Sequence, residues 1–165
     1  MITQERLKEL LHYDPETGVF TWNRALRKNM GRNGIAGTLK LKGNIEIQVD
    51  SKMYQAHRLA WLYVTGHLPV NQIDHRDTNP GNNRWKNLRE ATNLQNSQNR
   101  GKHKNNTSGY KGVNWHKRSK KWIARGRENG IRKNLGSFDT PEKASEAYEC
   151  FSRLAHAEFY YQPLE

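Results

Sequence analysis

The stretch QIDHRDTNPGNNRWKNLREATNLQN, residues 72–96, is dense in asparagine and places an aspartate directly before a histidine. Its first four residues suit a short strand, which the turn-forming residues of RDTNPGNNR then end. NLREAT indicates a second short strand, and Thr92 is a suitable cap for a polar helix. The order strand, loop, strand and helix predicts a small unit that brings Asp74, His75 and Asn96 together.

The side chains of this unit match the needs of phosphodiester hydrolysis. That reaction needs an activated water and a cation that offsets charge on the phosphate and the leaving oxygen. Histidine can take a proton from water, and carboxylate and amide oxygens bind hard divalent cations. One side of the predicted helix carries Asn93, Asn96, Asn99 and Arg100, a set unsuited to a core. On the residues alone, a plainer interpretation also stands, which is a polar loop with turn chemistry.

The whole chain is small and strongly basic. Its 165 residues, 34% of them hydrophobic, suit one domain or two small ones with modest cores. The formal net charge of +12 makes a polyanion the natural partner, and nucleic acid is the first candidate. No stretch approaches the roughly 18 apolar residues of a membrane span, so we expect no membrane partner. The single cysteine excludes an internal disulfide and fits a reducing, cytoplasmic compartment.

Short elements are expected before the asparagine-rich stretch. Residues 3–11 suit a helix, and the turn DPETG leads into a strand at VFTW. Residues 35–41 and 45–49 predict a hairpin closed by residues 42–44. AHRLAWLYVTGHLP predicts an apolar helix that ends near Gly66 and supplies the core of this half.

The chain changes character beyond a basic, polar segment at residues 101–109. YKGVNWH, KWIARGRE and RKNLGSF predict three strands, and Asn129 with Gly130 forms the turn between the last two. Thr140 is expected to cap a following helix that has Pro141 at its first position. The helix should pack on the sheet through Ala144, Ala147, Tyr148, Phe151, Leu154 and Ala155.

The middle strand of this sheet has two unlike faces, because successive side chains alternate. The face suited to the helix carries Trp122, Ala124 and Gly126. The opposite face carries Lys121, Ile123, Arg125 and Arg127. Residues 101–137 hold eleven basic side chains and one acidic, whereas residues 138–165 hold two and six. We therefore expect a basic sheet face suited to nucleic acid and an acidic helix on the other side.

The asparagine-rich stretch resembles the HNH motif of phage and intron-associated homing endonucleases. The shared pattern comprises Asp74 and His75, the turn GNNR, the triplet NLR that begins at Asn87, then Thr92 and Asn96. The resemblance implies that His75 is the general base and that Asn87 fixes the loop and the imidazole. It also implies that Asp74 and Asn96 are ligands of one divalent metal.

Two neighbouring features bear on this resemblance. His57 and Arg58 resemble the His-Arg pair found upstream of the motif in this group. Many HNH enzymes have a histidine where this chain has Asn96. An oxygen donor at that position favours Mg²⁺, or Mn²⁺, over zinc-like ligation.

The last third of the chain resembles the plant ethylene-response-factor (APETALA-type) DNA-binding domain. The landmarks are YKGV, KW, LGSFDT and the helical pattern A-x-x-A-Y. That family lays a three-stranded sheet in the major groove of DNA. By position, the resemblance implies base contacts from Lys111, Asn114, Arg125, Arg127, Arg132, Asn134 and Ser137. Phosphate contacts are expected from Lys117, Arg118, Lys120 and Lys121, and Arg100 is a further candidate DNA contact.

Together these patterns predict an α+β chain in which a ββα-metal nuclease module precedes a small three-stranded antiparallel sheet packed on one helix. The expected domains are residues 1–100, with the ββα core at about 71–100, a linker at 101–109, and the DNA-binding domain at 110–161. We expect a homing-type endonuclease of double-stranded DNA that works as a monomer or weak dimer, in the host cytoplasm or nucleoid if phage-encoded. A non-catalytic DNA-binding regulator with a relic HNH segment, and an RNA-directed protein, remain as alternatives.

Overall fold

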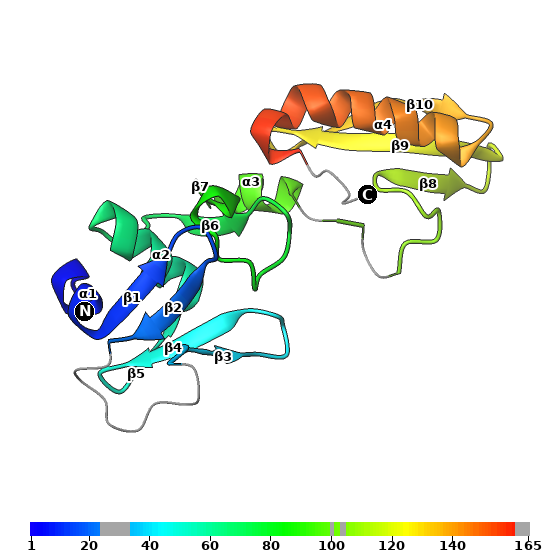
Figure 1. The fold of residues 1–165 in the computed structure, drawn as a ribbon. Helices are drawn as coiled ribbons and strands as arrows, with labels where there is room; N and C mark the ends of the chain where they lie inside the picture. Colours follow the sequence, from blue (N-terminus) through cyan, green and yellow to red (C-terminus); the bar gives the residue numbers. More distant parts are fainter. Residues whose placement is uncertain (24–33, 100, 103–104, 161–165) are drawn as a thin grey trace. The chain divides into compact units, whose positions relative to one another are not determined.

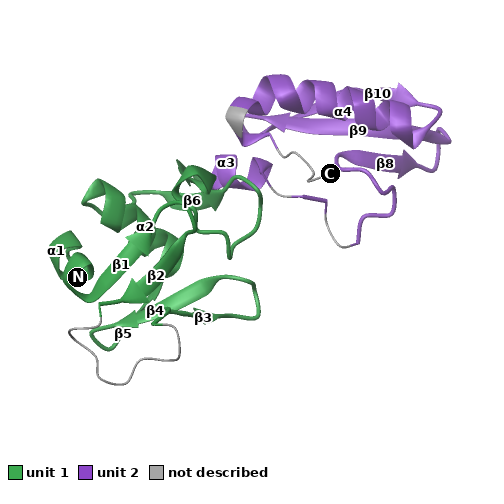
Figure 2. Cartoon of the chain, viewed as in Figure 1, with its two compact units in different colours: residues 1–92 green, residues 93–165 purple. Residues whose placement is uncertain are grey.

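The chain forms two compact units in a computed structural model that describes residues 1–23, 34–99, 101–102 and 105–160. The first unit comprises residues 1–92 and the second residues 93–165 (Figure 2). Each unit mixes helices with antiparallel strands and has its own hydrophobic core, which confirms the expected α+β class. None of the helices in the described residues has the length and apolar character needed to cross a membrane.

The first unit joins short strands to two α-helices (Figure 1). Its elements are α1 (Gln4–Leu10), β1 (Leu11–Asp14), β2 (Val19–Trp22), β3 (Thr38–Leu39), β4 (Ile45–Val49), β5 (Lys52–Gln55), α2 (Ala56–Thr65), β6 (Gln72–His75), η2 (Trp85–Asn87) and β7 (Leu88–Ala91). Among the described residues, β1 pairs with β2, β4 pairs with β3 on one side and β5 on the other, and β6 pairs with β7. The predicted strand, loop and strand of residues 72–91 are confirmed.

The core of the first unit is built around α2. Leu59 and Leu62 of this helix are buried together with Leu7 of α1 and Leu11 of β1. Gly66 ends the helix in the left-handed conformation, with φ 85°, as its position in the sequence predicts. The apolar helix therefore supplies the core to which the β6–β7 hairpin adds Ile73 and Leu88.

The strand expected at residues 35–41 is shorter than predicted. Trp22 donates its N–H to the Gly34 carbonyl, and Ala36 donates its N–H to the Phe20 carbonyl, each over 2.8 Å. Residues 34–36 are therefore bound to β2, and only β3, Thr38–Leu39, pairs with β4. Alternating apolar residues predicted an extended backbone here. They did not predict that its first residues bond to β2 and its later residues to β4.

The second unit is a three-stranded antiparallel sheet with a long helix on one face (Figure 1). Its elements are α3 (Asn93–Gln98), β8 (Val113–His116), β9 (Lys121–Glu128), β10 (Ile131–Phe138), α4 (Pro141–His156) and η3 (Ala157–Phe159). The strand order is β10, β9, β8. β8 starts three residues later than predicted, because the Ser108 hydroxyl bonds to the carbonyls of Tyr110 and Val113 and holds this segment in turns.

Helix α4 packs on the sheet largely as predicted. The Thr140 hydroxyl accepts the Lys143 N–H, and Pro141 occupies the first helical position. Ala144 and Tyr148 are buried against the sheet. The prediction for Leu154 was wrong, since this side chain is 81% exposed. Helical spacing predicted which side of the first turns packs on the sheet. It misplaced that side in the last two turns, where the buried positions are Ser152 and His156.

Candidate functional site

The β6–β7 hairpin holds Asp74 and His75 in the interior of the first unit. Asp74 lies directly opposite Arg89 in the register of the two strands. The Arg89 guanidinium donates to Asp74 Oδ2 from Nη2 over 2.7 Å and from Nε over 2.9 Å. Both side chains are buried, at 7% and 5% exposure. The cross-strand pair therefore fixes the orientation of the carboxylate and compensates its charge.

The loop between these strands is closed by an amide network around Asn87. The Asn87 amide nitrogen donates to Asp77 Oδ1 over 2.9 Å and to the Asn82 carbonyl over 2.7 Å. Its oxygen accepts the Asp77 N–H over 3.1 Å. Burial raises the pKa of Asp77, but hydrogen bonds from Asn79, Asn82 and Asn87 outweigh this and hold that pKa below its usual value. The loop is thus tied to an ionised carboxylate.

The amide that faces the His75 imidazole belongs to Asn83. Asn83 is 1% exposed, and its Oδ1 lies 3.3 Å from His75 Nε2. The Asn83 amide nitrogen points at the Gly81 carbonyl over 3.4 Å, and a carbonyl can only accept. This assigns the oxygen to the histidine side, so Nε2 carries the proton. The neutral ring then keeps its lone pair on Nδ1.

The surroundings of His75 favour the neutral ring. Burial lowers its pKa, and the hydrogen bond that the ring donates to Asn83 and the charges of Asp77 and Asp74 offset this only in part. The pKa of His75 therefore lies below the usual value of 6.5. At neutral pH the imidazole is in the form that can accept a proton.

A second histidine ring contacts His75. His57, at the start of α2, meets it edge to face, with 5.2 Å between ring centroids and 90° between ring planes. Desolvation, helped by His75 and by Arg58, lowers the pKa of His57 to about 4. Its Nδ1 is buried and has no hydrogen-bond partner among the described residues. Of the predicted His-Arg pair, His57 lies beside the site and Arg58 donates to the Pro69 carbonyl over 3.3 Å.

The β1–β2 hairpin packs against the loop that joins β6 to β7. The buried Tyr13 hydroxyl on β1 donates to the Asn83 carbonyl over 2.7 Å. Gly18, with φ 74°, lies so close to the loop that a Cβ there would be 2.4 Å from the Arg84 nitrogen. No larger residue fits at this left-handed position without moving the loop backbone. The β1–β2 hairpin therefore positions the amide that contacts the imidazole.

The remaining predicted nuclease residues lie further along the chain. Asn96 is on α3, which clusters with the second unit, whereas Asp74 and His75 are in the first. Arg100 lies outside the described residues.

The chemistry of Asp74 and Asn96 fits a hard divalent cation. The described residues include no group of three or more histidine, cysteine, aspartate or glutamate side chains that could hold a metal ion. Mg²⁺ is commonly held by one or two carboxylates together with phosphate oxygens and water, so a large protein cage is not required. A carboxylate oxygen and an amide oxygen are suitable donors for such an ion.

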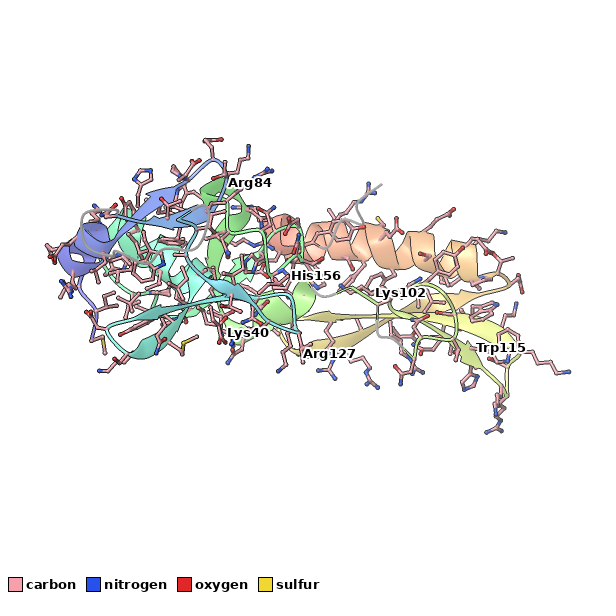
Figure 3. All side chains as sticks on the ribbon, turned by 60° about the horizontal axis from the view of Figure 1, so that its bottom comes forward. Lys40, Arg84, Lys102, Trp115, Arg127 and His156 are labelled. Atoms are coloured by element: carbon pink, nitrogen blue, oxygen red, sulfur yellow. The ribbon has the colours of Figure 1, made fainter. Side chains whose placement is uncertain are left out.

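The exposed face of the second sheet gathers most of the predicted DNA contacts. The register pairs Asn114 and Ser137 with Ile123, Asn134 with Arg125, and Arg132 with Arg127. Directly paired residues share a face, so these polar side chains lie together opposite buried Ala124. Figure 3 shows Arg127 pointing away from α4. The predicted division into a helix-covered face and a basic face is confirmed.

The other predicted cations lie at the edges of this face. Lys117, Arg118 and Lys120 are exposed on the turn between β8 and β9. Lys121 is paired with Asp139, with 2.5 Å between Nζ and Oδ1. Lys111 is half-buried and donates to the Gln98 carbonyl over 2.8 Å, and desolvation lowers its pKa to about 8. Of these five predicted contacts, the three on the turn are the ones fully presented to solvent.

Sequence reasoning gave no role to several residues that shape the site. Arg89 could have been found by counting cross-strand partners, because the pairing that aligns Leu88 with His75 also aligns Arg89 with Asp74. Asn83 was assigned only to the turn. Tyr13 acts across 70 positions in the chain, and no local pattern points to it.

Known families account for both units. Residues 54–98 match the HNH endonuclease family, and residues 108–156 match the AP2 domain. The chain is a member of the HNH endonuclease family that carries a C-terminal AP2 DNA-binding domain. It is similar to Protein 3.8 of Escherichia phage T7, with 35% identity over 109 residues that span 66% of this chain and 89% of that protein. No solved structure matches the chain.

These matches confirm the resemblance of each half of the chain to its predicted family. The order of the two domains is the one expected, and the HNH match is consistent with the ββα-metal fold of the first. An HNH domain beside an AP2 domain supports a role as a DNA nuclease or a DNA-binding protein. HNH nucleases generally use a divalent metal ion.

Proposed function

We propose that the protein is a site-specific, homing-type endonuclease that hydrolyses phosphodiester bonds in double-stranded DNA. The observation that carries this proposal is the state of His75, a buried neutral imidazole whose Nε2 is engaged by Asn83. A ring held in this way offers Nδ1 as a base. The Arg89 guanidinium fixes the orientation of the neighbouring Asp74 carboxylate.

In the proposed reaction, Nδ1 of His75 takes a proton from a water that attacks phosphorus in line. The bond from phosphorus to the 3′ oxygen breaks, and that oxygen takes a proton from solvent, which leaves a 5′-phosphate and a 3′-hydroxyl. Asp74 and Asn96 would hold Mg²⁺ or Mn²⁺, which supplies positive charge against the phosphate and the leaving oxygen. Asn87 and Asn83 keep the loop and the ring in place during proton transfer.

We assign the AP2 module, at residues 110–161, to affinity and register on the target. Its basic face carries three arginines that can contact bases or phosphates. Residues 1–100 would cut, and residues 101–109 would link the two parts. The relative is a phage protein, so we place the activity, as a monomer or weak dimer, in the cytoplasm or nucleoid of a host cell.

Incubation of supercoiled plasmid with the protein tests this function. We expect nicked or linear plasmid in Mg²⁺ or Mn²⁺ and intact plasmid when a chelator is present. A non-catalytic DNA-binding regulator would retard the plasmid in a gel and leave it uncut under both conditions. Competition between duplex DNA and structured RNA at fixed salt separates a DNA-directed from an RNA-directed protein.

A further inference from the structure

The turn between β3 and β4 presents an apolar side chain at its tip. Lys40 donates its N–H to the Asn44 carbonyl, and Gly43 donates its N–H to the Lys40 carbonyl, each over 2.8 Å. These bonds leave Leu41 and Lys42 at the end of a tight hairpin. Leu41 is fully exposed, at 109%, and Leu39 is 68% exposed. Turn positions usually favour polar residues or glycine, so two exposed leucines here are unusual.

This turn packs against the loop that carries Asn83. Gly43, with φ 84°, approaches Pro80 so closely that a Cβ would be 3.1 Å from the proline Cγ. A Cβ on Gly81 would likewise be 3.1 Å from the Gly43 carbonyl oxygen. Gly81 is the residue whose carbonyl accepts from Asn83, the amide beside His75. The turn therefore lies against the loop that supplies the amide beside His75, within the same unit.

The charges around Leu41 suit a polyanion. Lys40 and Lys42 flank it on both sides, and Figure 3 shows Lys40 at this hairpin. Lys40 also pairs with Glu46, with 3.4 Å between Nζ and Oε2, and its side chain remains 42% exposed. An apolar tip between two lysines is the combination by which proteins insert a wedge between base steps and hold the neighbouring phosphates.

We propose that Leu41 inserts into duplex DNA from the minor groove, between the bases next to the phosphate held at His75, with Lys40 and Lys42 on the flanking phosphates. The location of the wedge rests on the proposed function, because it assumes that DNA is held at His75. Insertion unstacks a base step and unwinds the helix locally. Unwinding can be measured without cleavage.

Relaxation of closed circular plasmid tests the wedge. The full-length protein is bound to plasmid in chelator, a topoisomerase that needs no metal relaxes the DNA, and linking number is measured after the protein is removed. We expect a shift in linking number with the wild type and a much smaller shift with Leu41→Ala. Leu41→Phe should retain the shift, because a phenyl ring can also unstack bases. Leu154→Ala, at an exposed leucine on α4, is the matched control and should behave as wild type.

Binding to the same plasmid provides the second readout. Leu41→Ala should weaken binding by roughly tenfold, in line with the loss of one buried leucine side chain. An equal shift and equal affinity for wild type and Leu41→Ala would overturn the wedge. Binding weakened by Lys42→Gln, with the shift intact in Leu41→Ala, would also overturn it, since the hairpin would then contact phosphates alone. A shift that depends on Leu41 in a protein that cuts no DNA would support the wedge and reject the nuclease.

Discussion

His75 lies between an amide and a second imidazole, and each neighbour acts on it differently. Asn83 fixes the position of its proton through a contact of 3.3 Å to Nε2. His57 covers one side of the ring and is itself neutral, because burial lowers its pKa to about 4. Two adjacent imidazoles would repel if both were charged. The site is therefore built for neutral rings, with consequences for stability at low pH.

His57 predicts an acid-dependent loss of stability. Its pKa is about 4 in the native protein and 6.5 as the ordinary value, so the unfolded chain binds more protons between these values. Stability must then fall as pH drops from 6.5 towards 4. Linkage predicts that wild type loses about 2 kcal/mol more than His57→Phe between pH 7.5 and pH 5. Urea unfolding at both pH values checks this, and equal losses in the two proteins would contradict it.

The buried pair of Asp74 and Arg89 predicts a large cost of truncation. Arg89→Ala removes the guanidinium that compensates the buried Asp74 carboxylate, which should lower the free energy of unfolding by about 3 kcal/mol or more. Arg6, whose pair with Asp50 spans 3.0 Å at the surface, supplies the control. Arg6→Ala should change the free energy far less, because solvent screens an exposed pair. Equal effects in urea unfolding would show that the Asp74 pair has no special role.

At the scale of elements, the site depends on two hairpins that are far apart in the chain. β6 and β7 carry Asp74, His75 and Arg89, and β1 with β2 supports the loop between them. Tyr13 also packs against Phe20 and Tyr63, with ring centroids 4.7 and 5.7 Å away. The hydroxyl that reaches Asn83 is thereby anchored in the core of the first unit.

Tyr13→Phe should damage cleavage more than binding. The change removes the 2.7 Å hydrogen bond to the Asn83 carbonyl and leaves that buried group unsatisfied, at a cost of about 1–3 kcal/mol. We expect a lower cleavage rate at saturating DNA and unchanged DNA affinity. Tyr63→Phe, in the same aromatic cluster, is the control and should leave the rate near that of wild type. Equal rates for all three proteins would remove Tyr13 from the positioning of His75.

Features that depend on residues close together in the chain could be predicted from the sequence, whereas contacts between distant segments could not. The strands around Asp74 and Arg89 and the cap at Thr140 were predicted correctly, because turn residues, alternation and capping are local signals. The contacts of Asn83 with His75 and Tyr13 were not, because they depend on how distant segments pack. The roles assigned to Asp74, Asn87 and Asn96 remain predictions.

At the scale of the whole molecule, the charge of +12 is concentrated where DNA contact is expected. The second unit separates its charges, with arginines on the bare face of the sheet and most of its acidic residues on or near α4. Such a separation orients the domain on a polyanion before any base is read. The basic face should therefore govern the salt dependence of binding.

Arg125→Ala combined with Arg127→Ala should weaken DNA binding and flatten its dependence on salt. Loss of two cationic contacts to DNA reduces the slope of log affinity against log salt by about 1–2. Lys143→Ala combined with Arg153→Ala removes the same charge from α4 and is the matched control. Fluorescence anisotropy across a salt series gives both slopes. An equal reduction by both pairs would show that net charge matters and that the sheet face does not.

The proposed function depends most on His75, the residue assigned as the base of the nuclease centre. The most direct measurement compares wild type with His75→Ala for cleavage of supercoiled plasmid in Mg²⁺ and for affinity to the same DNA. We expect that the variant binds DNA with nearly unchanged affinity and cuts it at least about 100-fold more slowly. Cleavage by His75→Ala at the wild-type rate would contradict it.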